Sequence, residues 1–173
     1  MNRFITMVFL FLLMCSFLPV SPAVSADKVH DIEITLERGM CFGTCPVYSV
    51  SLFGNGTIVW MGEMFVDVIG NRTEFIDPAM VADLYDQIIY GGFQDFADLY
   101  THLNITDMPS ATLTARNGTD MKQVFHYHGD YTAPENLTYM ENAVDNVGNT
   151  SRWVGTYTPD EDTKENQIKF DVF

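Results

Sequence analysis

The sequence predicts an α+β fold in which two main helices pack on one face of an antiparallel sheet. Two pairs of segments alternate apolar and polar residues around an Asn-Gly turn, which is the pattern of a β-hairpin. Each pair is followed by a segment whose apolar residues recur at helical spacing. Because strands that precede helices in this order favour a layered arrangement, we expect two hairpins, extra strands and two helices on one face.

The first hairpin is the most regular of these patterns. Residues 32–36 alternate apolar and polar side chains and predict a half-buried strand. Residues 48–52 alternate in the same way, and the Gly-Asn-Gly turn at residues 54–56 leads into a return strand at residues 58–60. Residues 65–69 are mostly apolar and lie between glycines, so they predict a third strand.

The first helix is predicted to begin at Asp77. An aspartate N-cap followed by proline is a common helix start, and the apolar residues between 80 and 89 recur at helical spacing. Gly91 ends this pattern. The aromatic residues between 93 and 100 predict a short helical extension over the core.

The second half of the chain repeats the order of the first. Residues 111–115 and 121–127 predict a hairpin around the turn Asn117-Gly118. Pro134 then opens a second helical pattern, which Gly148 ends.

The N-terminal segment has the layout of a secretory signal peptide. Residues 1–26 contain one positive residue, then an apolar run, then prolines and small residues, so we expect cleavage after Ala26. An uncleaved anchor formed by residues 4–24 and a lipoprotein lipidated at Cys15 are the alternatives. Residues 27–155 then form a single domain, and residues 156–173 form an acidic, mobile tail.

The charge excludes two classes of partner. A formal net charge of −14 repels nucleic-acid phosphates and anionic lipid, so contact with a membrane is expected only through the N-terminal segment. The sequence contains neither a Gly-x-Ser-x-Gly nucleophile motif nor a His-Glu-x-x-His zinc motif. It therefore favours a role without catalysis and predicts no cofactor.

Cys41 and Cys45 are the cysteines that remain after cleavage, and an even count in an exported protein predicts a disulfide. One alternative is a thiol-disulfide redox pair, although a strand and not a helix follows the cysteines. The other is a zinc site completed by His126 and His128, which lie two apart on a predicted strand and share a face. Three points count against this alternative: Val124 lies on the same face, the exterior of a cell oxidises thiols, and paired histidines on an outer strand face are usually solvated.

Asn-x-Ser/Thr acceptor sites for N-glycosylation recur along the chain. Turn chemistry explains the two that begin Asn-Gly-Thr, but not the others. The possible glycosylation sites are Asn55, Asn71, Asn104, Asn117, Asn136 and Asn149.

Several segments also carry a resemblance to a known family. Cys41-Phe-Gly-Thr-Cys-Pro-Val-Tyr48 fits the pattern Cys-Phe-Gly-x-Cys-Pro-x-Tyr at the opening of a hairpin. Further matching positions are Ile34-Thr-Leu-Glu-Arg38, Gly54 to Gly56, Phe93, Tyr100, Asp107-Met-Pro109, Tyr127, Pro134-Glu-Asn-Leu137, Asp145 and Trp153-Val-Gly155. In these segments the chain resembles an uncharacterised family of exported prokaryotic domains, a domain of unknown function. Asn55 departs from the pattern, because an aspartate is more usual in that turn.

The resemblance implies a small exported domain and assigns no catalytic residue. Together with the leader and the cysteines, it predicts a binding or structural role at the cell envelope or outside the cell. The expected partner is an envelope protein or a glycan.

Overall fold

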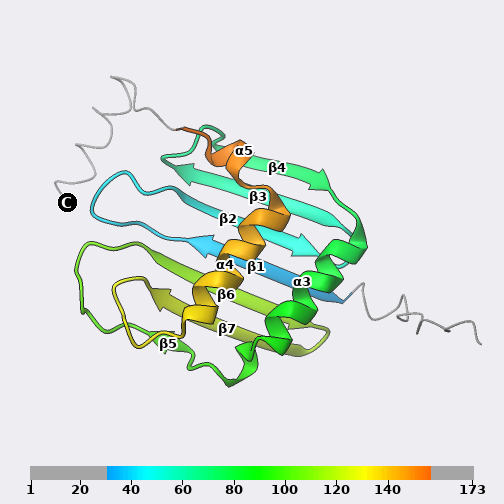
Figure 1. The fold of residues 1–173 in the computed structure, drawn as a ribbon. Helices are drawn as coiled ribbons and strands as arrows, with labels where there is room; N and C mark the ends of the chain where they lie inside the picture. Colours follow the sequence, from blue (N-terminus) through cyan, green and yellow to red (C-terminus); the bar gives the residue numbers. More distant parts are fainter. Residues whose placement is uncertain (1–30, 157–173) are drawn as a thin grey trace, which may run out of the picture.

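The computed structural model describes residues 31–156 and has the α+β architecture (Figure 1). Seven strands form one sheet in the order β4-β3-β2-β1-β6-β7-β5. In this order each neighbouring pair is antiparallel except the last, because the edge strand β5 runs parallel to β7. The sheet is therefore mixed, and the expectation of a purely antiparallel sheet is wrong at this edge.

The strands and helices have the following bounds. The strands are β1 (Ile32–Arg38), β2 (Val47–Phe53), β3 (Thr57–Met64), β4 (Gly70–Phe75), β5 (Leu99–Tyr100), β6 (Ser110–Asn117) and β7 (Asp120–Tyr127). The helices are α3 (Pro78–Tyr90), α4 (Glu135–Gly148), the short α5 (Ser151–Val154) and the 3-10 helix η1 (Phe93–Asp95).

The first strand lies at the centre of the sheet. β1 pairs with β2 on one side and with β6 on the other, so each predicted hairpin lies beside it. Ile34 and Leu36 are fully buried under the helices, while Glu33 and Thr35 lie on the opposite face. The alternation seen in the sequence is thus the alternation between the two faces of the sheet.

Both main helices lie across one face of the sheet (Figure 1). Asp77 caps α3 as predicted, because its carboxylate accepts a hydrogen bond of 2.9 Å from the backbone N–H of Ala79. Pro134 precedes the first turn of α4, also as predicted. Each helix buries an apolar stripe against the sheet; the stripes consist of Val81, Leu84 and Ile88 on α3, and Leu137, Met140 and Val144 on α4.

The predicted strand at residues 65–69 does not form. β3 extends to Met64, and the chain then loops back before β4 begins at Gly70. In this loop the backbone N–H groups of Asp67 and Val68 donate to carbonyls of α5, and the Val68 carbonyl accepts from the Trp60 indole. The backbone groups of the loop therefore pair with a helix that arrives late in the chain, which local sequence does not reveal.

The predicted helical extension at residues 93–100 is limited to η1. Gly92 has a left-handed backbone, with φ 88°, and redirects the chain so that Phe93 is buried. Leu99 and Tyr100 then pair with β7, and the Phe125 N–H donates to the Asp98 carbonyl. The free edge of β7 offers hydrogen-bond partners that a helix in this position would leave unused.

Three expectations fall outside the described residues. These are the signal peptide at residues 1–26, the anchor at residues 4–24 and the acidic tail at residues 156–173, of which only the first residue is described. Within residues 31–156, each helix is too short or too polar to cross a bilayer.

Candidate functional site

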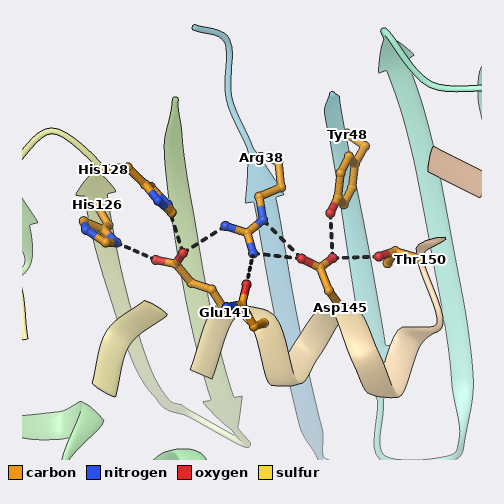
Figure 2. A network of polar contacts seen from close by, with 8 residues as sticks. Arg38, Tyr48, His126, His128, Glu141, Asp145 and Thr150 are labelled. Atoms are coloured by element: carbon orange, nitrogen blue, oxygen red, sulfur yellow. Dashed lines mark hydrogen bonds and ion pairs between the residues drawn. The ribbon is translucent and has the colours of Figure 1, made fainter. Parts of the chain in front are cut away.

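A cluster of charged and imidazole side chains lies between the sheet and α4 (Figure 2). We call it the charged cluster and define it as Arg38, His126, His128, Glu141 and Asp145. Arg38 on β1, His126 on β7 and His128 just after β7 lie on the helix-covered face, and α4 presents the two carboxylates one turn apart. The cluster joins elements that are remote in sequence.

Glu141 is the centre of the cluster and is fully buried. Its Oε1 lies 2.7 Å from Nδ1 of His126, while its Oε2 lies 2.9 Å from Nη1 of Arg38 and 3.0 Å from Nε2 of His128. Burial alone would raise the pKa of Glu141, but the contacts with both imidazoles and the positive charge of Arg38 outweigh burial and lower that pKa to about 2. Glu141 is therefore an ionised carboxylate in the core.

Asp145 and Arg38 form the second half of the cluster. Asp145 accepts hydrogen bonds from Arg38 at 2.8 Å, from the Tyr48 hydroxyl at 2.6 Å and from the Thr150 hydroxyl at 2.8 Å. Burial and the neighbouring Asp145 carboxylate together raise the pKa of Tyr48 well above its ordinary value. Burial tends to lower the pKa of Arg38, but the two carboxylates outweigh burial and raise it. At neutral pH Arg38 is therefore positively charged and the Tyr48 hydroxyl keeps its proton.

His126 lies on the inner face of β7 and His128, just after the strand, lies on the same side, so the expectation of a solvated outer face is wrong. His126 is 5 % exposed, and its ring stacks on that of His128 with the centroids 4.4 Å apart. The even-numbered positions of β7 point toward the helices because Val124 anchors that face in the core. In the sequence, Val124 was therefore the residue that indicated which face of β7 is buried.

The Nε2 atom of His128 has no hydrogen-bond partner among the described residues, although it is shielded from solvent. It lies close to Oε2 of Glu141, but the geometry of this contact is not that of a hydrogen bond. Buried polar nitrogens without a partner are uncommon in folded proteins.

Cys41 and Cys45 are joined in a disulfide, with their Cα atoms 5.8 Å apart. The bond leaves no thiolate to bind a metal, so the four-residue zinc set with His126 and His128 is not assembled. The disulfide instead closes a short loop between β1 and β2 at one end of the sheet.

A pocket of about 290 Å³ lies beside the charged cluster. Arg38, Tyr48, His128 and Asp145 line it from the cluster side, and Cys45 lines it from the disulfide loop. The pocket therefore connects the cluster to the loops at this end of the sheet.

Exposed apolar side chains crowd the same loops. The loop at residues 39–46 and the loop at residues 101–109 are joined by a hydrogen bond of 3.3 Å from the Phe42 N–H to the Asp107 carbonyl. We call these two loops the apolar loop end. Its exposed apolar side chains are Met40, Phe42, Leu103, Ile105 and Met108.

The possible glycosylation sites lie mostly on the surface. The exposed asparagines are Asn55, Asn71, Asn104, Asn136 and Asn149. Asn117, at the end of β6, is half-buried. Surface exposure is what an acceptor site requires, but it does not by itself make one.

Sequence reasoning gave no role to Arg38, Glu141 or Asp145. A signal was nevertheless present, because Arg38 continues the buried alternation of β1. Likewise, Glu141 follows Met140 on the apolar stripe of α4. A charged residue at a core-facing position needs a partner, and such positions are the ones to search for a site.

The sequence of the chain matches a known protein family. Residues 32–148 match the family model described as Domain of unknown function (DUF6438). The chain belongs to this family. The matched region runs from β1 to the end of α4, so the charged cluster lies within it. A comparison with curated proteins found no match.

Proposed function

We propose that this chain is an exported binding domain without catalytic activity, and that the apolar loop end is its binding surface. The partner that fits this surface is an envelope protein with an apolar contact area surrounded by basic residues. The observation that carries the proposal is the exposure of Phe42, which is 87 % exposed on a loop closed by a disulfide.

The shape of the loop end supports a binding role. An aromatic side chain held out by a closed loop loses little conformational entropy on binding, which favours its use as an anchor. Hydrogen bonds fix the neighbouring loop, because the Tyr127 hydroxyl donates to the Ile105 carbonyl and accepts from the Met108 N–H. The loops are thus preorganised, and exposed apolar side chains gathered on neighbouring loops favour an interaction site.

The charge of the chain supports the expected character of the partner. A net charge of −14 favours a basic surface and disfavours an acidic one. Export is supported by the signal-peptide layout of residues 1–26, by the disulfide and by the exposed acceptor asparagines.

Crosslinking in the native envelope tests the proposal. The full chain is expressed in its host with a photo-crosslinking residue at position 42, and adducts are identified by mass spectrometry. We expect one protein to dominate the adducts and Met40→Ser to reduce its yield at least several-fold. Met121→Ser is the matched control, because Met40 and Met121 are 65 % and 64 % exposed but lie at opposite ends of the sheet.

Two results would contradict the proposal. Equal yields for Met40→Ser and Met121→Ser would show that the loop end does not select the partner. Protection of the domain from protease added outside intact cells, with digestion after lysis, would show that it is not exported.

A further inference from the structure

We propose that His126, His128 and Glu141 form a binding site for one zinc ion. The inference does not rest on the proposed function, because the site lies in the charged cluster and not on the exposed loops. It differs from the zinc set that the sequence allows as an alternative to the disulfide, since Glu141 takes the place of the two cysteines.

The three side chains already converge. Nδ1 of His126 and Nε2 of His128 lie 2.7 Å and 3.0 Å from the two oxygens of Glu141, and all the possible ligand atoms lie within 4.8 Å of one another. Around tetrahedral zinc, nitrogen and oxygen ligands lie about 2 Å from the ion and therefore about 3.4 Å from one another. Because the two rings now stack at an interplanar angle of 17°, they must rotate about their side-chain bonds for both nitrogen lone pairs to point at one ion.

The surroundings of His128 are a second observation, because its Nε2 is shielded from solvent and faces Oε2 of Glu141 at 3.0 Å without hydrogen-bond geometry. Among the buried side-chain nitrogen and oxygen atoms of residues 31–156, Nε2 of His128 is the one that makes no hydrogen bond. A zinc ion between the two rings and the carboxylate would satisfy it. Two histidines and one glutamate are a set that zinc commonly uses, with a fourth position left for another ligand.

The charges of the cluster also favour a cation. Glu141 and Asp145 provide two carboxylates, whereas Arg38 provides one guanidinium, so one buried negative charge lacks a partner if both imidazoles are neutral. Arg38 remains paired with Asp145 at 2.8 Å when Glu141 turns toward an ion. A zinc ion therefore supplies positive charge without leaving the guanidinium unpaired.

The position of the site gives an ion access to the surface. His128 lines the pocket of about 290 Å³, so the fourth zinc position can be reached by water or by a small oxygen ligand from the pocket. Zinc at Nδ1 of His126 binds the lone pair of that nitrogen, so the bound form is the tautomer with its proton on Nε2.

Zinc titration of the full chain, purified without chelator, tests the proposal. Zinc ion alone is added at pH 7.5 in competition with a chromophoric indicator, and stoichiometry and affinity are measured for the wild type and for His126→Gln, His128→Gln and His102→Gln. We expect one zinc per chain, with affinity reduced at least about tenfold in the first two variants. His102→Gln is the control, because it removes an exposed histidine outside the cluster.

Arg38→Gln provides a readout that a purely structural role would not move. The variant removes a positive charge 2.9 Å from Glu141, so zinc should bind at least several-fold more tightly. Unchanged or weaker binding in folded Arg38→Gln would count against Glu141 as a ligand.

Imidazole nitrogen NMR of the wild type keeps the test independent of variants that fail to fold. Zinc should shift Nδ1 of His126 and Nε2 of His128 and leave His102 unchanged. Absence of zinc binding, retention of full affinity in His128→Gln, or equal loss in His102→Gln would each overturn the proposal.

Discussion

At the scale of single residues, buried charge decides how this domain holds together. The Asp145 carboxylate receives four hydrogen bonds: two from Arg38 on β1, one from Tyr48 on β2 and one from Thr150 after α4. The carboxylate therefore ties α4 to β1 and β2, and it also ties α4 to the turn that leads into α5. A buried pair that loses one partner leaves an uncompensated charge, which is more costly than the pair is favourable.

Asp145→Asn should lower the free energy of unfolding by about 3 kcal/mol, because Arg38 loses one of its two carboxylate partners in a largely buried place. Chemical denaturation at pH 7 measures the change. Asp86→Asn on the exposed face of α3 is the matched control and should change stability by less than about 0.5 kcal/mol. A similar effect of both substitutions would mean that Asp145 is not a structural anchor.

Asp130 gives the domain a pH-dependent contact. Burial alone would raise the pKa of Asp130, but the Thr132 hydroxyl, the backbone N–H groups of His102 and Thr132, and the His102 ring outweigh burial and hold that pKa well below its ordinary value. The carboxylate connects the loop at residues 101–109 to the end of β7.

The stabilisation from Asp130 should be fully present above the pKa of an unfolded aspartate, about 3.9, and should be lost as pH falls below it. Asp130→Asn removes the contribution, so the wild type should exceed the variant in stability at pH 7, and this difference should shrink below about pH 4. Urea unfolding at pH 7, 5 and 3 measures it. A difference that grows on acidification would have the wrong sign for a lowered pKa.

At the scale of elements, the disulfide sets how β1 leads into β2. Cys41 and Cys45 close a short loop whose aromatic residue, Phe42, points into solvent. The strand β2 begins two residues after Cys45. In redox-active pairs a helix begins at the cysteines instead, and its N-terminus lowers the pKa of a thiol. The expected role of the pair is structural.

Replacing both cysteines by serine should lower the free energy of unfolding by about 2 kcal/mol, the loop-entropy contribution of so short a closed loop. Thermal and urea unfolding of the oxidised wild type and the double variant measure it. A redox-active disulfide would have a reduction potential near those of known protein oxidants, whereas a structural disulfide has a much lower one. We therefore expect the Cys41–Cys45 bond to stay oxidised in glutathione buffers that reduce the redox-active proteins. Ready reduction in those buffers would revive the redox alternative.

At the scale of the whole molecule, the two faces of the sheet differ. The helices α3 and α4 cover one face, while the other carries polar side chains such as Thr35 and Ser51, joined by a hydrogen bond of 2.8 Å. The acceptor asparagines are distributed over turns, an edge strand, a loop and the ends of α4. Glycans at these places would leave the core packing unchanged.

Glycopeptide mass spectrometry of protein from its native host should find the lowest occupancy at Asn117. Its side chain is half-buried at the end of β6, whereas the other five acceptors are exposed. A glycosyltransferase that acts on the folded domain therefore reaches Asn117 least easily. Full occupancy of Asn117 with empty exposed sites would contradict this ranking.

The sequence by itself determined the elements with strong local signals. Alternation and the Gly-Asn-Gly turn specified β1, β2 and β3, and Asp77 and Pro134 marked the starts of both helices. It also indicated the disulfide and the assignment to a domain of unknown function. These signals act over a few residues, so they can be read without knowing which segments meet in space.

Only the tertiary structure decided the parallel edge strand, the loop at residues 65–69 and the charged cluster. Each depends on partners far along the chain, such as the hydrogen bond between Arg38 and Asp145. The side of β7 that faces the helices could have been inferred from Val124, but the meeting of His126 with Glu141 required the helix to be placed over the sheet. Long-range packing determines which buried polar groups find partners, and that choice defines the site.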